Sequence, residues 1–237
     1  INFLLLILIS GFSLLFLYVV VLFVIPRTII FSYLWKMPKS EYPILYSDPI
    51  EIELNQTTDL KYPTKEFKEI KFIIPSQKVI SEKLSKEGIG KTFDFGESKR
   101  MIVSEGLNPI SIFNEYKNDK RFFYLKIQEV SSNLDFFKAL ASARVDDVSL
   151  FNSNTILVTK FVNIEIKSSV FLGKDSQRLY HFTTPNVEAF ESELGDLKNK
   201  PVVVIDKKTN KDYLFIFSKN ISQDEIRLVL SSINTDK

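Results

Sequence analysis

The chain has 237 residues, and its 31 basic and 29 acidic side chains leave a formal net charge of +2. This near balance argues against a dedicated nucleic-acid binder, which usually carries a strongly basic face. The absence of cysteine excludes disulfides, a cysteine nucleophile and thiolate metal centres, and a single histidine, His181, excludes sites built on two imidazoles. We therefore expect neither a bound metal nor a cofactor.

Residues 1–25 contain no charged side chain and are predominantly apolar. A bilayer core about 30 Å thick requires roughly 20 apolar residues in a helix, whose backbone satisfies its own hydrogen bonds. The segment is longer than the apolar region of a cleaved signal peptide and no Ala-x-Ala site follows it, while a core helix rarely lacks polar residues for so long. The sequence predicts a single transmembrane helix over 1–26, in contact with the lipid bilayer.

Aromatic and basic residues follow the apolar segment. Tyrosine and tryptophan favour the headgroup level and lysine side chains extend toward water. The side chains expected at the membrane interface are Arg27, Tyr33, Trp35, Lys36 and Lys39. The basic residues flank only the C-terminal end of the span, which by the positive-inside tendency places the large domain in the cytoplasm. One basic residue before Ile1 would weaken this orientation, and two would be enough to reverse it.

Residues 27–66 are expected to form an interfacial collar and a linker punctuated by four prolines, with a first strand where isoleucine and glutamate alternate over 50–54. Residues 67–237 are expected to form the soluble domain. Its predicted strands are 71–75, 101–103, 121–130, 155–171, 178–183, 201–206 and 212–218. Its predicted helices are 76–86, 109–117, 133–144, 184–194 and 222–233.

This mixture of strands and helices predicts an α+β domain with a mixed sheet. Two capping signals support its last helices: Thr184 precedes a proline at a first turn, and Ser222 with Glu225 forms a capping box. Residues 121–171 show the same strand–helix–strand–strand order as the C-terminal part. A degenerate duplication is therefore considered, although no residue-level match supports it.

Residues 85–92 read SKEGIGKT and approximate a phosphate-binding P-loop. That loop requires glycine where Ser85 stands, a strand before it and a helix after it. Here a predicted helix precedes the segment and residues of strand character follow it. We interpret it as a helix ending at Gly88 with Gly90 in the following turn.

Asp206, Asn210 and Asp212 surround a predicted hairpin turn and offer oxygen atoms to a hard cation. No glycine supplies the sharp bend of a calcium loop, and three lysines in the same segment would repel a cation. We therefore prefer the interpretation that these residues form a solvated hairpin tip and not a cation site.

His181 lies in the middle of a predicted strand. A catalytic histidine requires an orienting carboxylate and a nucleophile, neither of which lies near it in the sequence, and no G-x-S-x-G elbow is present. We interpret it as a packed sheet histidine. A hydrolase based on serine and lysine would require no histidine and stays open.

The apolar anchor, the proline-punctuated tether, the balanced charge and the lack of a convincing catalytic set predict a non-enzymatic, single-pass membrane protein. It would bind another protein as an accessory or assembly subunit of a membrane complex, with no nucleic acid. Two alternatives stay open. One is a membrane-tethered hydrolase whose site is assembled only on folding, and the other is a sensor of a lipid headgroup or small ligand.

Overall fold

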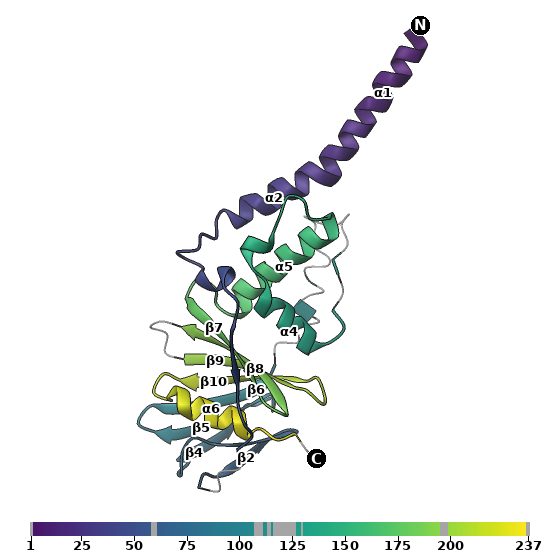
Figure 1. Ribbon diagram of the computed structural model, residues 1–237. Helices are drawn as coiled ribbons and strands as arrows, with labels where there is room; N and C mark the ends of the chain where they lie inside the picture. The colour runs from purple at the N-terminus through teal and green to yellow at the C-terminus, as the bar shows by residue number, and fades with distance from the viewer. Residues whose placement is uncertain are drawn as a thin grey trace.

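The computed structural model describes residues 2–57, 61–106, 111–112, 115, 127–128, 130–194 and 199–235. Its fold is mixed α+β, as the sequence predicts, with an apolar helix at the N-terminus. In Figure 1 this helix projects from one end of a head, α4 and α5 lie between the helix and the sheet, and the C-terminus lies at the far end.

The N-terminal helix consists of α1 (Asn2–Val19), a π-helical turn η1 (Val20–Val24) and α2 (Ile25–Leu34). Pro26 has no N–H with which to bond the carbonyl of Leu22, and a wide π turn is a common way for a helix to accommodate such a gap. In α2, Ile30 and Leu34 are buried against the head. Within the described residues, 10–34 form one helix long and apolar enough to cross a membrane, although a signal sequence or a core helix also meets that test.

The head is built on an eight-stranded sheet in the order β1-β7-β8-β9-β10-β6-β5-β4. Its strands are β1 (Ile50–Glu53), β4 (Ser81–Leu84), β5 (Gly90–Gly96), β6 (Lys99–Glu105), β7 (Ser176–Thr183), β8 (Val187–Leu194), β9 (Asn199–Asp206) and β10 (Asp212–Ser218). The edge strand β1 is parallel to β7 and all other neighbours are antiparallel, which makes the sheet mixed. A separate two-stranded sheet pairs β2 (Thr64–Phe67) with β3 (Ile70–Ile73).

Helices cover both faces of the central strands. One face packs against α4 (Asn133–Ser142) and α5 (Asn154–Val170), and the other against α6 (Gln223–Ser232) and the small sheet. Successive residues of β9 alternate between these two cores, since Val203 belongs to the first and Val202 and Val204 to the second. Burial on both faces explains why this strand is apolar without interruption.

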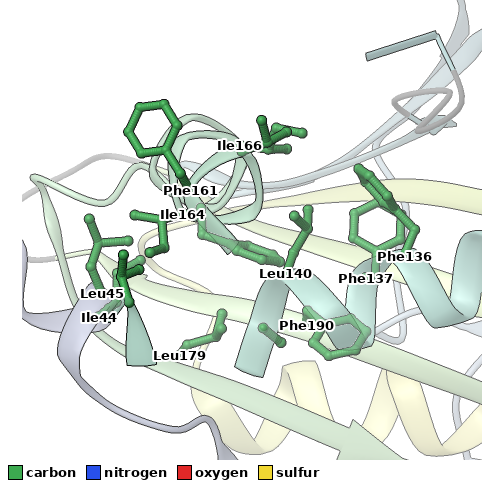
Figure 2. Packing of buried hydrophobic residues seen from close by; sticks show 14 of the residues in the cluster. Ile44, Leu45, Phe136, Phe137, Leu140, Phe161, Ile164, Ile166, Leu179 and Phe190 are labelled. Atoms are coloured by element: carbon green, nitrogen blue, oxygen red, sulfur yellow. The ribbon is translucent and has the colours of Figure 1, made fainter. Parts of the chain in front are cut away.

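Figure 2 shows the core between the sheet and the helices α4 and α5. The rings of Phe137 and Phe190 stack with their centroids 6.2 Å apart. Ile44 and Leu45, from the short 3-10 helix η2 (Pro43–Tyr46), are fully buried in the same cluster. Much of the predicted linker 27–66 therefore packs on the head, since α2 and η2 contribute to its core and β1 to its sheet.

The structure confirms the strands predicted at 50–54, 71–75, 101–103, 178–183, 201–206 and 212–218, and the helices predicted at 133–144 and 222–233. The capping box of Ser222 and Glu225 is present. The predictions at 109–117 and 121–130 lie largely outside the described residues.

Three predicted elements are wrong. Part of the helix predicted at 76–86 is the strand β4, the strand predicted at 155–171 is the helix α5, and the helix predicted at 184–194 is the strand β8. In place of a helix cap, Thr184 closes the β7–β8 turn, where its Oγ1 accepts from the amide of Val187 at 2.9 Å. The duplication is also wrong, because residues 133–170 form helices, among them α4 and α5, whereas residues 176–218 form four strands.

We expect Phe137→Ala to lower the free energy of unfolding by about 3–5 kcal/mol, the usual effect of removing a buried aromatic ring. Phe137 is fully buried, whereas Leu84 is 65% exposed. Leu84→Ala, the control, should change stability by less than about 1 kcal/mol. The measurement is thermal or chemical unfolding of the full chain in mild detergent, and equal effects of the two substitutions would contradict the packing described.

Candidate functional site

The junction between the apolar helix and the head is built around the buried guanidinium of Arg27. It donates to the carbonyls of Leu150 at 2.9 Å, Asn152 at 2.7 Å and Phe23 at 3.1 Å. It also donates to Oδ1 of Asn154 at 2.8 Å and lies 3.4 Å from the centre of the Phe23 ring. One side chain thus joins the helix to the loop that precedes α5.

Asn154 completes the junction from the side of the head. Its Nδ2 donates to the carbonyl of Leu22 at 2.6 Å. This carbonyl is the one that an N–H at position 26 would bond in a regular α-helix, and Pro26 supplies none. A side chain of the head donates to this carbonyl instead, so the head makes a direct hydrogen bond to the irregular turn of the helix.

The predicted interface residues have different surroundings in the structure. Arg27 is enclosed by protein, and its partners in the head lie more than 120 residues away in the sequence. The ring of Tyr33 packs edge-on to Phe161 at 5.8 Å, and Lys36 Nζ lies 5.5 Å from the Tyr33 ring. Trp35 is 88% exposed, and Lys39 is also exposed. Contact of these residues with a membrane stays a prediction.

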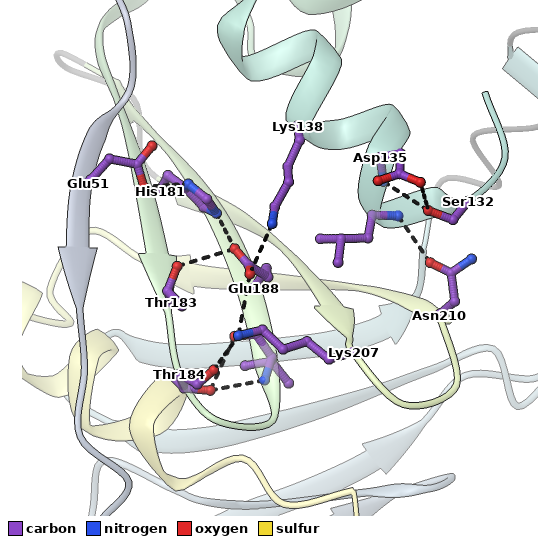
Figure 3. A network of polar contacts seen from close by, with 12 residues as sticks. Glu51, Ser132, Asp135, Lys138, His181, Thr183, Thr184, Glu188, Lys207 and Asn210 are labelled. Atoms are coloured by element: carbon purple, nitrogen blue, oxygen red, sulfur yellow. Dashed lines mark hydrogen bonds and ion pairs between the residues drawn. The ribbon is translucent and has the colours of Figure 1, made fainter. Parts of the chain in front are cut away.

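A second polar assembly surrounds His181 on β7 (Figure 3). Its Nδ1 lies 2.6 Å from a carboxylate oxygen of Glu51, its Nε2 contacts the carboxylate of Glu188, and its ring stacks on Phe190 at 4.4 Å. The sequence offers His181 no adjacent carboxylate, and the fold supplies two. Strand pairing brings the carboxylates to it, because β1 pairs Glu51 with His181 and β8 returns antiparallel to β7.

Glu188 is the centre of this assembly and is 5% exposed. Lys138 of α4 and Lys207 of the β9–β10 turn lie 3.2 Å and 3.3 Å from its Oε1. Thr183 donates to Oε2 at 3.2 Å. Burial raises the pKa of Glu188, but the hydrogen bonds from His181 and Lys138 and the charges of His181 and Lys207 outweigh it and hold this pKa below its ordinary value.

Both ring nitrogens of His181 face carboxylates, and the hydroxyl of Thr183 already donates to one of them. This arrangement connects β1, β7, β8, α4 and the β9–β10 turn. The Thr183 hydroxyl donates to a carboxylate whose pKa is lowered and which is therefore a weak base, so the geometry suits a structural clamp.

Lys167 of α5 forms a second buried clamp. It is fully buried, and its Nζ donates to the carbonyls of Ala141 at 2.7 Å and Ala143 at 2.8 Å, with that of Ser47 at 3.4 Å. Burial lowers the pKa of Lys167 to about 8. This cation holds the C-terminal end of α4 against α5, where the helix dipole also favours positive charge.

The remaining sequence candidates lie in turns. Residues 85–89 connect β4 and β5, and residues 90–92 belong to β5. A strand, not a helix, therefore precedes Gly88, whose φ of 70° suits the turn. The helix end inferred there is wrong, and no helix N-terminus follows to receive a phosphate.

Asp206 is buried and accepts from the amide of Lys208 at 2.9 Å, and Asn210 Oδ1 accepts from the amide of Leu134 at 3.0 Å. Within the described chain, no group of three histidine or acidic residues could hold a metal ion.

We expect Arg27→Met to loosen the head from the helix, because hydrogen bonds to a charged group typically contribute about 1.5–3 kcal/mol each. Amide hydrogen exchange of the full chain in mild detergent should become faster in the first turn of α5. Lys39→Met removes an exposed charge near the same helix and is the control. Unchanged exchange in Arg27→Met would contradict the proposed role of the junction.

We expect Glu188→Gln to lower the free energy of unfolding at pH 7 by about 1–3 kcal/mol. The pKa of Glu188 in the folded chain lies below its ordinary value of 4.5, so its charge stabilises the fold above pH 4.5 and this contribution disappears as the pH falls further. The difference between the variant and the wild type should therefore shrink at lower pH. Glu53→Gln, an exposed position on β1, should show no such trend, and a difference that persists unchanged to pH 3 would count against the clamp.

Three comparisons with known proteins gave no match for this chain. No family model, no curated protein and no solved structure matched it. Its function must therefore be inferred from the junction, the two buried clamps and the exposed surfaces of this chain alone.

Proposed function

We propose that the chain is a single-pass membrane protein that holds its α+β head rigidly at the membrane surface, as a non-enzymatic accessory or assembly subunit. The observation that carries this proposal is the junction of Arg27 and Asn154 with the Phe23 and Leu22 carbonyls. A cleaved leader would remove these partners and leave polar groups of the head unsatisfied. The junction therefore favours a helix that stays with the head.

The exposure of the helix supports a lipid environment. Phe12, Leu14 and Phe16 are 70%, 68% and 72% exposed, which is unfavourable in water over a continuous surface and unlike a core helix. A helix over residues 2–22 measures about 32 Å at 1.5 Å per residue, close to a hydrocarbon thickness of about 30 Å. The proposed span thus ends where the head begins to contact the helix, and Tyr33, Trp35, Lys36 and Lys39 follow it.

The opposite end of the head offers an edge for a protein partner. The strand β4 ends the eight-stranded sheet and lies far from α1 in Figure 1. Ile80, Leu84 and Ile89, in and beside the β4–β5 hairpin, are 62%, 65% and 48% exposed. A terminal strand with exposed apolar side chains can accept an extended segment of another chain. We propose this edge as the contact with the partner and place the head on the cytoplasmic side, as the basic flank favours.

The test begins with native membranes. The full chain should stay with membranes washed in alkaline carbonate, and protease added to sealed vesicles should reach the head only from the cytoplasmic face. After mild detergent extraction, the wild type should purify with a stoichiometric partner. Leu84→Asp should lose this partner, whereas Leu172→Asp, an exposed leucine just before β7 at the other side of the sheet, should keep it.

Each result separates one part of the proposal. Release of the intact chain by carbonate would contradict the anchor, and cleavage of the head from the extracytoplasmic face would reverse the orientation. Isolation of the wild type only as a lone monomer would contradict the accessory role. Loss of the partner from both variants would contradict the assignment of the β4 edge.

A further inference from the structure

The loop that precedes α5 carries an unusual pair of exposed apolar residues. Phe151 is 97% exposed and Leu150 is 54% exposed. A fully exposed phenylalanine is unfavourable in water, and a neighbouring exposed leucine enlarges the apolar surface. These two side chains form the tip of a loop rather than part of a scattered surface.

The loop is held in this conformation by hydrogen bonds on both sides of the tip. Arg27 donates to the carbonyls of Leu150 and Asn152, which flank Phe151. Ser149 supports the turn from within, because its amide donates to Asn152 Oδ1 at 2.9 Å and its Oγ accepts from the amide of Phe151 at 3.2 Å. The exposure of Phe151 is therefore a property of a built loop.

The same hydrogen bonds place the tip beside the end of the proposed span. Arg27 also donates to the carbonyl of Phe23, so the loop and the last apolar turn of the helix share one guanidinium. Val24 and Ile25 of that turn are themselves 44% and 39% exposed. The exposed apolar surface of the helix thus continues near the loop, at the depth where aromatic residues favour the headgroup region.

We propose that Leu150 and Phe151 insert into the bilayer interface beside the helix and give the head a second contact with lipid. This inference rests on the proposed function, because it requires residues 2–22 to cross the membrane. The helix and the loop would then contact the bilayer at two separate points. Two such contacts would fix the tilt of the head relative to the membrane, whereas a single helix leaves this tilt free to change. The occupant is lipid and not a protein, since the tip adjoins the surface that the span itself exposes to the bilayer.

The absence of cysteine allows a direct test with single labels in the full chain. Phe151→Cys, Phe16→Cys and Leu84→Cys would each carry an environment-sensitive fluorophore in phosphatidylcholine vesicles. Quenching would be measured with lipids that bear a shallow or a deep nitroxide and with aqueous iodide. At position 151 we expect a blue-shifted emission, strong quenching by the shallow nitroxide and a severalfold loss of iodide quenching relative to position 84.

A second measurement excludes insertion driven by the label itself. A label at Leu150→Cys should be quenched by the shallow nitroxide when Phe151 is present and severalfold less when Phe151→Asp is added. Equal quenching in the two backgrounds would overturn the proposal.

The label at position 16 separates this inference from the function on which it rests. If position 16 is quenched by lipid nitroxides while position 151 is as open to iodide as position 84, the span stands and the loop insertion is overturned. Shielding of position 151 from both iodide and lipid would indicate a protein contact and would also overturn it. Access of iodide to position 16 would refute the membrane span itself.

Discussion

The arrangement of this protein depends on the hydrogen bonds that join the head to backbone carbonyls of the apolar helix beside a proline. Pro26 cannot bond the Leu22 carbonyl, and Asn154 of the head supplies the missing hydrogen bond. Arg27 adds donors to the next carbonyl and to the loop before α5. Unsatisfied backbone groups are strongly unfavourable near hydrocarbon, so the helix and the head stabilise each other at this point.

The two buried clamps, around Lys167 and around Glu188, connect the elements of the head to one another. Lys167 fixes α4 to α5, and Glu188 connects Lys138 of α4 to His181 and the sheet. The helices that contact α2 are thereby tied to the strands behind them. If the chain spans a membrane and binds a partner at β4, as we propose, these connections would hold the partner at a defined distance from the bilayer.

The sequence predicts those elements whose signals are local. The capping box of Ser222 and Glu225 and the hairpin of β9 and β10 depend on neighbouring residues, and both are present. The helix α5 escapes prediction because it is buried on most sides, which leaves β-branched residues such as Val162, Ile164 and Ile166 without a clear helical period. The sequence does not predict the strand β8 for a related reason. This strand is buried on both faces, so it carries apolar residues such as Val187 and Phe190 at a spacing that also fits a helix.

The polar sites are even harder to predict from the sequence than these elements. No local pattern indicates that Arg27 is enclosed, because its partners at 150, 152 and 154 approach only after folding. Strand register, which a single sequence does not specify, brings Glu51 and Glu188 to His181. The apolar helix, by contrast, can be predicted without tertiary information, since its length and composition are properties of the chain itself.

The π turn at Val20–Val24 divides the apolar helix into two parts whose sequences meet different requirements. A π turn contains more residues than an α turn, so the side chains that face outward from α1 and those that α2 turns to the head do not form one continuous stripe. Apolar substitutions that preserve the length of α1 can therefore accumulate without disturbing Ile30 and Leu34. A single-residue insertion or deletion between the turn and Arg27 has a different effect: it would swing the whole head about the helix axis by roughly 100°.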